Sequence, residues 1–275
     1  MRLGSFRKWY KEFRFWFAAG NKSLTAYYYK NLYRPRKRSL AAFIDCYGRL
    51  KSNVTFLQVG ANDGFFHDPL YKFIRRYGWK GVLLEPQQDV FIRYLQRLYK
   101  GVDGVTPVNA ALDHADGYRP VYKIAFSNSR WATGLTTFSY DTIRAAIDSG
   151  HVERSARRHG ESLPSDREAY VTEQQVKCIS PETLIRTYRL KPLDWVQIDA
   201  EGYDFEIIKM LDVGQLSPEV IVFEHTHLPE KEYQECRKHL VQNGYSLSRI
   251  SENTIALRTW NKAWAEYFDN DNKQA

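Results

Sequence analysis

Short apolar runs alternate with amphipathic segments along most of the chain, starting near residue 54. Five runs have the length and residue types of buried strands: 55–59, 81–85, 104–108, 195–199 and 219–224. The segments between them carry apolar residues at helical spacing: 68–77, 88–99, 181–188, 203–211 and 230–242. Strands that alternate with helices predict a parallel sheet covered by helices on both faces, a Rossmann-like α/β fold.

The end of the chain modifies this picture. Residues 245–250 and 254–258 flank the polar turn Ser251-Glu252-Asn253 and predict a closing hairpin, so the sheet should be mixed and mostly parallel. Residues 116–177 interrupt the rhythm with a long, polar, arginine-rich stretch, which we interpret as an insertion that forms a substrate lid. A flexible surface loop is the alternative, and it is favoured for residues 151–166.

Charge divides the chain into parts. The net charge is +8, but residues 1–39 contain eleven Lys or Arg and one acid, so the remainder is slightly negative. We expect a basic helical extension over 1–45, a catalytic domain over 46–260 and a tail over 261–275. In the extension, one helix face would collect aromatic residues: Phe6, Trp9, Tyr10, Phe13, Trp16 and Phe17.

Two interpretations of this aromatic face remain open. A helix with an aromatic stripe and a cationic side is typical of the headgroup region of an anionic membrane, and residues 1–38 would then bind that surface. Alternatively, the stripe packs on the protein's own core. The charge alone could attract RNA, but no nucleic-acid motif accompanies it, so a nucleic-acid partner is not expected.

Other features bear on location. No run approaches the length of a membrane span, and the N-terminus lacks the pattern of a secretory signal. Cys46, Cys178 and Cys236 show neither a disulfide pattern nor zinc-ligand spacing. We therefore expect a cytoplasmic protein, either soluble or peripheral on the inner face of the membrane. Nothing in the pattern predicts an oligomeric state.

Candidate chemistry begins where the first strand ends in Gly60-Ala61-Asn62-Asp63-Gly64. Glycines in such a turn let backbone approach a ligand closely, although the G-x-G-x-x-G pattern of dinucleotide folds is absent. The second strand ends in Glu85-Pro86, where a carboxylate can accept hydrogen bonds from both ribose hydroxyls of an adenosine. Asn109-Ala110-Ala111 follow the third strand and suit an adenine ring.

Five blocks occur in one order along residues 53–258, and together they resemble the FkbM family of methyltransferases. The blocks are Gln58 to Gly64, Glu85-Pro86, Asn109-Ala110-Ala111, Ile198-Asp199-Ala200-Glu201-Gly202-Tyr203-Asp204, and Phe223-Glu224-His225. The resemblance implies a class I methyltransferase fold, S-adenosylmethionine as methyl donor, and O-methylation, commonly of sugar hydroxyls on glycans or natural products. The residues expected to bind the donor are Gln58, Gly60, Asn62, Asp63, Gly64, Glu85, Pro86, Asn109, Ala110 and Ala111. Gln58 stands where many such enzymes carry an acid.

Methyl transfer to a hydroxyl requires removal of a proton near the ends of the later strands. His225 is the first candidate for the base and Asp199 the second, with Glu201 beside them. Alternatively, Asp199 and Glu224 with His225 or His227 would hold a Mg²⁺ that binds the acceptor's hydroxyls.

In the insertion, Trp131 either stacks on a sugar or pins the lid to the core, and His227 is a candidate substrate contact. Two other functions remain open. The same strand, loop and acid could serve a nicotinamide-dependent oxidoreductase, and a membrane-associated scaffold could retain the fold without catalysis.

Overall fold

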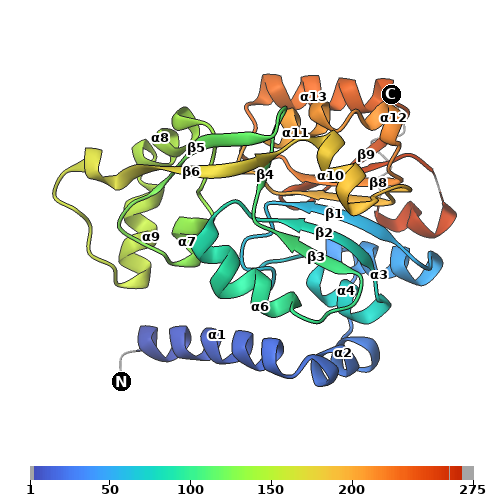
Figure 1. The fold of residues 1–275 in the computed structure, drawn as a ribbon, viewed down its shortest axis with the longest axis horizontal. Helices are drawn as coiled ribbons and strands as arrows, with labels where there is room; N and C mark the ends of the chain where they lie inside the picture. Colours follow the sequence, from blue (N-terminus) through green and yellow to red (C-terminus); the bar gives the residue numbers. More distant parts are fainter. Residues whose placement is uncertain (1–2, 260, 268–275) are drawn as a thin grey trace.

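The computed structural model describes residues 3–259 and 261–267, and a seven-stranded sheet lies at its centre (Figure 1). The strand order is β3-β2-β1-β7-β8-β10-β9. The strands are β1 (Thr55–Val59), β2 (Lys80–Leu84), β3 (Val105–Val108), β7 (Trp195–Ile198), β8 (Val220–Glu224), β9 (Ser246–Ile250) and β10 (Asn253–Leu257). The first five strands of the sheet run parallel, and β10 runs antiparallel to both of its neighbours. The predicted mixed, mostly parallel sheet is confirmed.

Both faces of the sheet are buried because alternate strand residues point to opposite sides. Phe56 of β1 belongs to one core cluster and Leu57 to the other, and Trp195 and Val196 of β7 divide in the same way. Each cluster therefore receives every second residue of a nearly continuous apolar run. This arrangement explains why the strands appear in the sequence as apolar runs rather than alternating patterns.

Helices cover both faces of the sheet. One core cluster includes residues of α3 (Leu40–Leu50), α4 (Tyr71–Tyr77), η1 (Phe91–Leu95) and α6 (Gln96–Tyr99), and the short helix α5 (Gln88–Val90) leads directly into η1. The other includes α10 (Pro181–Tyr188), α11 (Asp204–Met210), α12 (Val213–Leu216) and α13 (Glu230–Gln242). The bounds of α10 and α13 agree with the predicted ranges. Ser180 caps α10 by accepting a hydrogen bond from the Thr183 N–H at 3.3 Å, and Pro181 occupies the first helical position.

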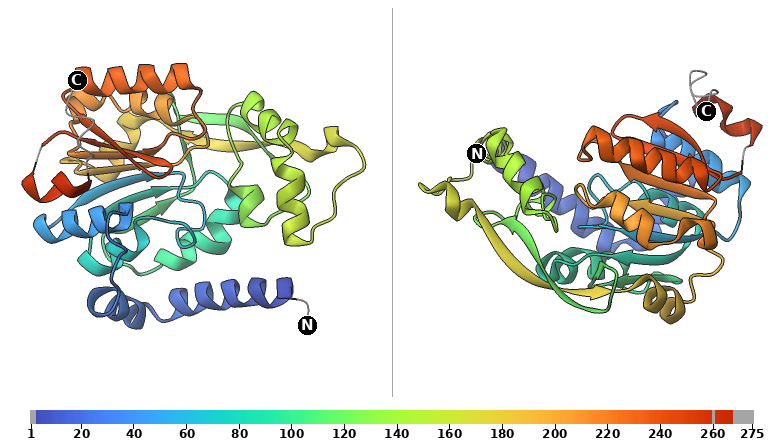
Figure 2. Two further views of the ribbon diagram at one scale, coloured as in Figure 1. Left: turned by 180° about the vertical axis from the view of Figure 1, so that it is seen from behind. Right: turned by 90° about the horizontal axis from the view of Figure 1, so that it is seen from above.

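The insertion is an ordered subdomain that extends to one side of the main sheet (Figures 1 and 2). A second sheet in the order β4-β6-β5 supports four helical segments. The elements are β4 (Ala111–Leu112), β5 (Gly117–Ile124), α7 (Arg130–Thr133), α8 (Tyr140–Asp148), α9 (His151–His159), η2 (Arg167–Tyr170) and β6 (Val171–Ile179).

The prediction of a flexible loop over residues 151–166 is wrong for the first nine residues, which form α9. Gly150 and Gly160 bracket this helix in the left-handed conformation. Val152 and Ala156, four residues apart, form a narrow buried stripe, and Val152 belongs to a core cluster that also contains residues of α8. Most of the remaining positions are charged, so the apolar signal was too narrow to predict the helix.

The N-terminal extension consists of α1 (Leu3–Gly20) and α2 (Lys22–Asn31), which lie along the lower edge of the molecule in Figure 1. At the other end of the chain, η3 (Lys262–Tyr267) buries Trp264 and Tyr267 against Phe43 of α3. The first part of the predicted tail thus packs on the domain, and residues 268–275 lie outside the described residues. None of the helices in the described ranges is long and apolar enough to cross a membrane.

Candidate active site

A cavity of about 620 Å³, open solvent at its mouth included, lies at the carboxyl ends of β1, β2 and β7. The chain leaves β1 toward β2 on one side and later returns as β7 on the other, so this edge is the topological switch point. Ligands of open α/β sheets bind at such points. Predicted residues that line the cavity are Gly60, Asn62, Glu85, Pro86, Ala110, Ala111, Asp199 and Glu201.

Glu85 is held rigidly at the tip of β2. Its side chain is buried, with 2% exposure, and it accepts hydrogen bonds of 2.8 Å from the backbone N–H groups of Asn62 and Gln87. Burial raises the pKa of Glu85 from 4.5 to about 7, because a carboxylate loses hydration when it is enclosed. The two backbone bonds favour the charged form and oppose this shift. The cavity therefore contains a fixed acceptor at the position predicted for the ribose ligand.

The glycines of the first loop serve contacts within the protein. Gly60 has φ +80°, and a Cβ there would lie 1.8 Å from the backbone oxygen of Asp199. At Gly64 a Cβ would lie 2.5 Å from a methyl carbon of Leu95. The predicted reason for these glycines was clearance for a ligand. The structure instead shows that Gly60 allows the loop after β1 to meet the loop after β7. This contact brings Asp199 beside Gly60.

Four of the predicted donor-binding residues are absent from the cavity lining: Gln58, Asp63, Gly64 and Asn109. Gln58 donates a 2.8 Å hydrogen bond to Asp68. Asp63 accepts from two backbone N–H groups of its own turn, and Asn109 donates to two backbone carbonyls just after β2. These side chains fix the shape of the loops whose other residues line the cavity.

A cluster of acids surrounds one histidine beyond β7 and β8. Burial, reinforced by the charge of Glu224, raises the pKa of Asp199 from 3.8 to about 6. Burial, with the charges of Asp199 and Glu224, raises the pKa of Glu201 well above its usual value. His227 Nε2 lies 3.3 Å from Glu201 Oε2 and 3.6 Å from Glu224 Oε1, and burial lowers its pKa. The cluster thus places Asp199 and Glu201, two acids of raised pKa, near an imidazole whose pKa is lowered.

His225, the first candidate for the base, is not among the residues that line the cavity. Its Nδ1 lies 3.1 Å from Thr254 Oγ1, and its ring packs on Tyr233 with centroids 5.3 Å apart. Burial and the charge of Arg249 lower its pKa. The imidazole that contacts the acids is instead that of His227, the predicted substrate contact.

The Mg²⁺ alternative finds no prepared ligand set. Among residues 3–259 and 261–267, no group of three or more His, Cys, Asp or Glu is arranged to hold a metal ion. The charge of Glu224 contributes to the raised pKa of Asp199, whereas His225 makes its contacts with Thr254 and Tyr233.

Arg130 of α7 lines the cavity and was missed by the sequence analysis. Its Nε lies 3.6 Å from Asp63 Oδ2, and its charge opposes the burial that raises the pKa values of Glu85 and Asp199. The residue lies inside the insertion, where reasoning from strand ends does not apply. The neighbouring residues Thr133, Gly134, Thr136 and Thr137 line the same cavity.

Trp131 is part of the insertion's own packing. Its indole N–H donates to Glu161 at 3.1 Å, and its ring stacks on His159 with an interplanar angle of 24°. It is absent from the cavity lining. Both contacts lie within the insertion, so they show neither of the two roles considered, pinning of the lid to the main core or stacking on a sugar.

The sheet order, with one reversed strand between β8 and β9 and a cavity at the switch point, defines a class I methyltransferase fold. This class of enzyme uses S-adenosylmethionine. The family model described as the methyltransferase FkbM domain matches residues 58–247, which is more than half of the chain, and the chain belongs to this family.

Solved structures give more distant similarities. The methyltransferase FkbM from Methylobacillus flagellatus KT shares 11% identity with a TM-score of 0.47, over 88% of this chain and 53% of that chain. A SAM-dependent methyltransferase from Aquifex aeolicus shares 11% identity with a TM-score of 0.36, over 85% and 98%. A cofactor-bound protein from MTB shares 14% identity with a TM-score of 0.37, over 89% and 90%. The chain spans about half the length of the Methylobacillus protein. No curated protein matches it by sequence.

Proposed function

We propose that the protein transfers a methyl group from S-adenosylmethionine to a hydroxyl of a sugar, in a glycan, a glycolipid or a related metabolite. The observation that carries the proposal is the joint placement of Glu85 and Asp199 on one cavity at the switch point. One carboxyl group suits the ribose of the donor, and the other has the pKa of a base that is ionised at neutral pH.

The residues present fit the donor. Two residues that line the cavity each have a buried polar atom without a hydrogen-bond partner among the described residues: Gln87 Oε1 and Thr136 Oγ1. Buried polar atoms normally have partners, so these atoms are available to a ligand.

We assign parts of the donor to parts of the lining. Glu85 would accept the ribose hydroxyls, and the apolar wall formed by Ala110, Leu112 and Val121 would receive the adenine. The guanidinium of Arg130 would bind the donor's carboxylate, since arginine forms charge-assisted hydrogen bonds with such groups. When bound, the donor supplies an electrophilic methyl group on a sulfonium cation.

Asp199 is our candidate for the base, in place of His225. With a pKa of about 6 it is mostly ionised at pH 7, yet it is more basic than an exposed aspartate. It would accept the proton of the attacking hydroxyl. Glu201 lines the same cavity, and His227 Nε2 lies close to both Glu201 and Glu224.

Calorimetry with S-adenosylhomocysteine tests the donor site, and NADH in a parallel thermal-shift assay tests the oxidoreductase alternative. We expect binding and stabilisation by S-adenosylhomocysteine alone. Transfer of labelled methyl groups to cell-envelope glycans would then identify the acceptor. Absence of donor binding at millimolar concentration would contradict the proposal, and donor binding without any transfer would favour the scaffold alternative.

The same proposal places the enzyme in the cytoplasm, peripheral to the inner face of the membrane. The charge excess within residues 1–39 supports this location, because anionic lipid attracts clustered Lys and Arg. A glycolipid acceptor would present its sugar at such a surface.

A further inference from the structure

We propose that α1 and α2 form a rigid docking surface for an anionic lipid bilayer, in which a row of exposed aromatic and aliphatic side chains enters the headgroup region. This inference names the partner and the surface that meets it. It is independent of the methyl-transfer chemistry, because vesicle binding requires neither donor nor acceptor.

The packing of α1 carries the first step. Two residues of the helix, Phe15 and Ala18, are buried against the domain, and Phe15 makes edge contacts with Phe65 and Tyr94 at centroid distances of 5.9 and 5.0 Å. Phe13 is 52% exposed, and four other aromatic residues of this helix are also exposed: Trp9, Tyr10, Trp16 and Phe17. Packing on the core, one of the two alternatives left open by the sequence, therefore accounts for only part of this helix. A narrow stripe packs on the core, while most of the aromatic face remains outside.

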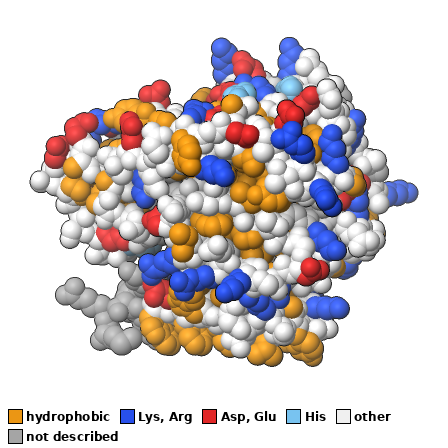
Figure 3. Space-filling view, viewed as in Figure 1, with side chains coloured by type: hydrophobic (Ala, Val, Ile, Leu, Met, Phe, Trp, Pro, Cys, Tyr) orange, Lys and Arg blue, Asp and Glu red, His pale blue; other side chains and the backbone are white. Residues whose placement is uncertain are grey.

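The exposed face continues along α2. Leu32, just after the helix, is 62% exposed, and Leu24, Tyr27 and Tyr28 are exposed as well. Figure 3 shows hydrophobic side chains along the lower edge of the molecule, where Figure 1 places α1 and α2, with Lys and Arg side chains directly above them. Contiguous apolar patches on a soluble protein usually mark a binding surface.

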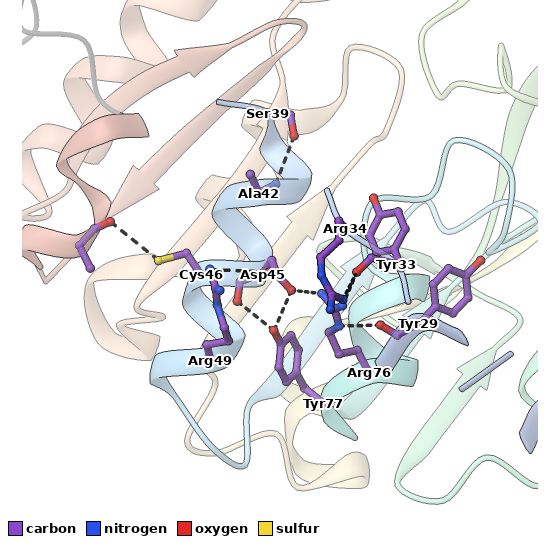
Figure 4. Close-up of polar contacts among 11 residues, drawn as sticks. Tyr29, Tyr33, Arg34, Ser39, Ala42, Asp45, Cys46, Arg49, Arg76 and Tyr77 are labelled. Atoms are coloured by element: carbon purple, nitrogen blue, oxygen red, sulfur yellow. Dashed lines mark hydrogen bonds and ion pairs between the residues drawn. The ribbon is translucent and has the colours of Figure 1, made fainter. Parts of the chain in front are cut away.

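A buried clamp holds this face in position (Figure 4). Arg76 of α4 donates from Nε to the backbone oxygen of Tyr29 at 2.7 Å and from Nη2 to that of Tyr33 at 2.5 Å, and it pairs with Asp45 of α3. Arg75 donates to the backbone oxygen of Lys22 at 2.8 Å. The extension is thus tied to two helices of the domain. The exposed aromatic residues are therefore held in a fixed position before any membrane is bound.

Charge complementarity identifies the partner. Residues 1–39 have a net charge of +10, whereas the remainder has −2, so the net positive charge of the chain is concentrated in this segment. Cations lie at the level of the rings: Arg14 is 5.9 Å from the Tyr10 centroid and Arg97 is 5.4 Å from that of Trp16. Aromatic rings beside guanidinium groups suit the boundary between phosphates and acyl chains. A second copy of this face would carry the same positive charge and would repel the first.

Co-sedimentation of the full chain with vesicles tests the inference. We expect binding to phosphatidylglycerol and phosphatidylcholine mixtures, weakened by salt, and little binding to phosphatidylcholine alone. Trp9→Ser, Phe13→Ser and Phe17→Ser together should lower the bound fraction by roughly tenfold or more, because each ring buries apolar area in the membrane. Point substitutions are preferable to removal of residues 1–38, since Phe15 and Tyr29 belong to the core.

The matched control is Tyr118→Ser on β5, which removes an aromatic ring that is 74% exposed on the insertion. It should leave vesicle binding unchanged. Equal binding of the triple variant and the wild type would overturn the inference, as would equal binding to neutral and anionic vesicles. Two other results would assign the face to another partner. One is a wild-type dimer that the triple variant fails to form, and the other is binding of single-stranded RNA that the wild type and the control show and the triple variant lacks.

Discussion

Replacing Glu85 with Gln should change how the stability of the protein depends on pH. Burial raises the pKa of Glu85 from 4.5 to about 7 in the folded protein, whereas the unfolded chain ionises at the ordinary value. The folded state therefore holds this proton more tightly than the unfolded state. Its contribution to stability is fully present below pH 4.5 and is lost as pH rises through 7. A glutamine side chain does not ionise in this pH range, so the variant should not show this decrease in stability.

The structure sets the size of the effect. A pKa that moves from 4.5 to about 7 corresponds to about 3 kcal/mol, most of which develops between pH 5 and pH 8. Glutamine keeps one acceptor oxygen, so one of the two backbone N–H groups that Glu85 now satisfies loses its partner. That loss costs about 1–3 kcal/mol, but at every pH alike. It cancels when the difference between variant and wild type is compared at two pH values.

Urea unfolding of both proteins at pH 5 and pH 8 measures this change. The stability of Glu85→Gln relative to the wild type should increase by about 2–3 kcal/mol between the two values. Glu173→Gln, on an exposed position of β6, is the control and should show no such increase. A relative stability of Glu85→Gln that stays constant over this range would refute the reasoning. Weaker binding of S-adenosylhomocysteine to the same variant, measured by calorimetry, would separately support the ribose contact.

Three further predictions concern the cavity and its loops. Gly60→Ala should destabilise the protein by more than about 2 kcal/mol in urea unfolding, because its Cβ meets the Asp199 carbonyl. Gly78→Ala, also left-handed but with nothing within 4 Å, should lose only about 1 kcal/mol. Asp199→Asn should lower the rate of labelled methyl transfer by roughly 10²–10⁴ with donor binding retained, and the wild-type rate should rise as pH increases through about 6. Arg130→Ala should weaken the binding of S-adenosylhomocysteine by roughly tenfold or more, as measured by calorimetry. It should leave the binding of 5′-methylthioadenosine, which lacks the carboxylate, unchanged.

The main sheet could be predicted from the sequence because its central strands β1, β2, β7 and β8 are buried on both faces and therefore appear as apolar runs. The glycine turn and Glu85 follow two of these runs, and they place the cavity at the correct edge. The insertion was harder, since α9 buries only Val152, Ser155 and Ala156 beneath a charged surface. Because the insertion is polar, its sequence did not predict an ordered subdomain or the position of Arg130 at the cavity.

The two histidines after β8 show a second limit of prediction from the sequence. Sequence position places both His225 and His227 at the end of a strand that points toward the cavity, and it gives no means of choosing between them. The choice depends on the path of the chain after Glu224, where the His225 N–H bonds to the Glu252 carbonyl at 3.1 Å. That contact with the β9–β10 turn directs one imidazole toward Tyr233 and leaves the other with the acids.

The charges around the cavity suggest which ligands it discriminates. Glu85, Asp199 and Glu201 line it together with Arg130, and burial raises the pKa of each of the three acids. Ionised carboxylates in such a place are unfavourable unless positive charge lies nearby. Arg130 supplies part of that charge from the insertion, and a cationic ligand would supply more. A sulfonium donor should therefore bind more tightly than its neutral product at the same carboxylate contacts, and the difference should grow with pH as the acids ionise.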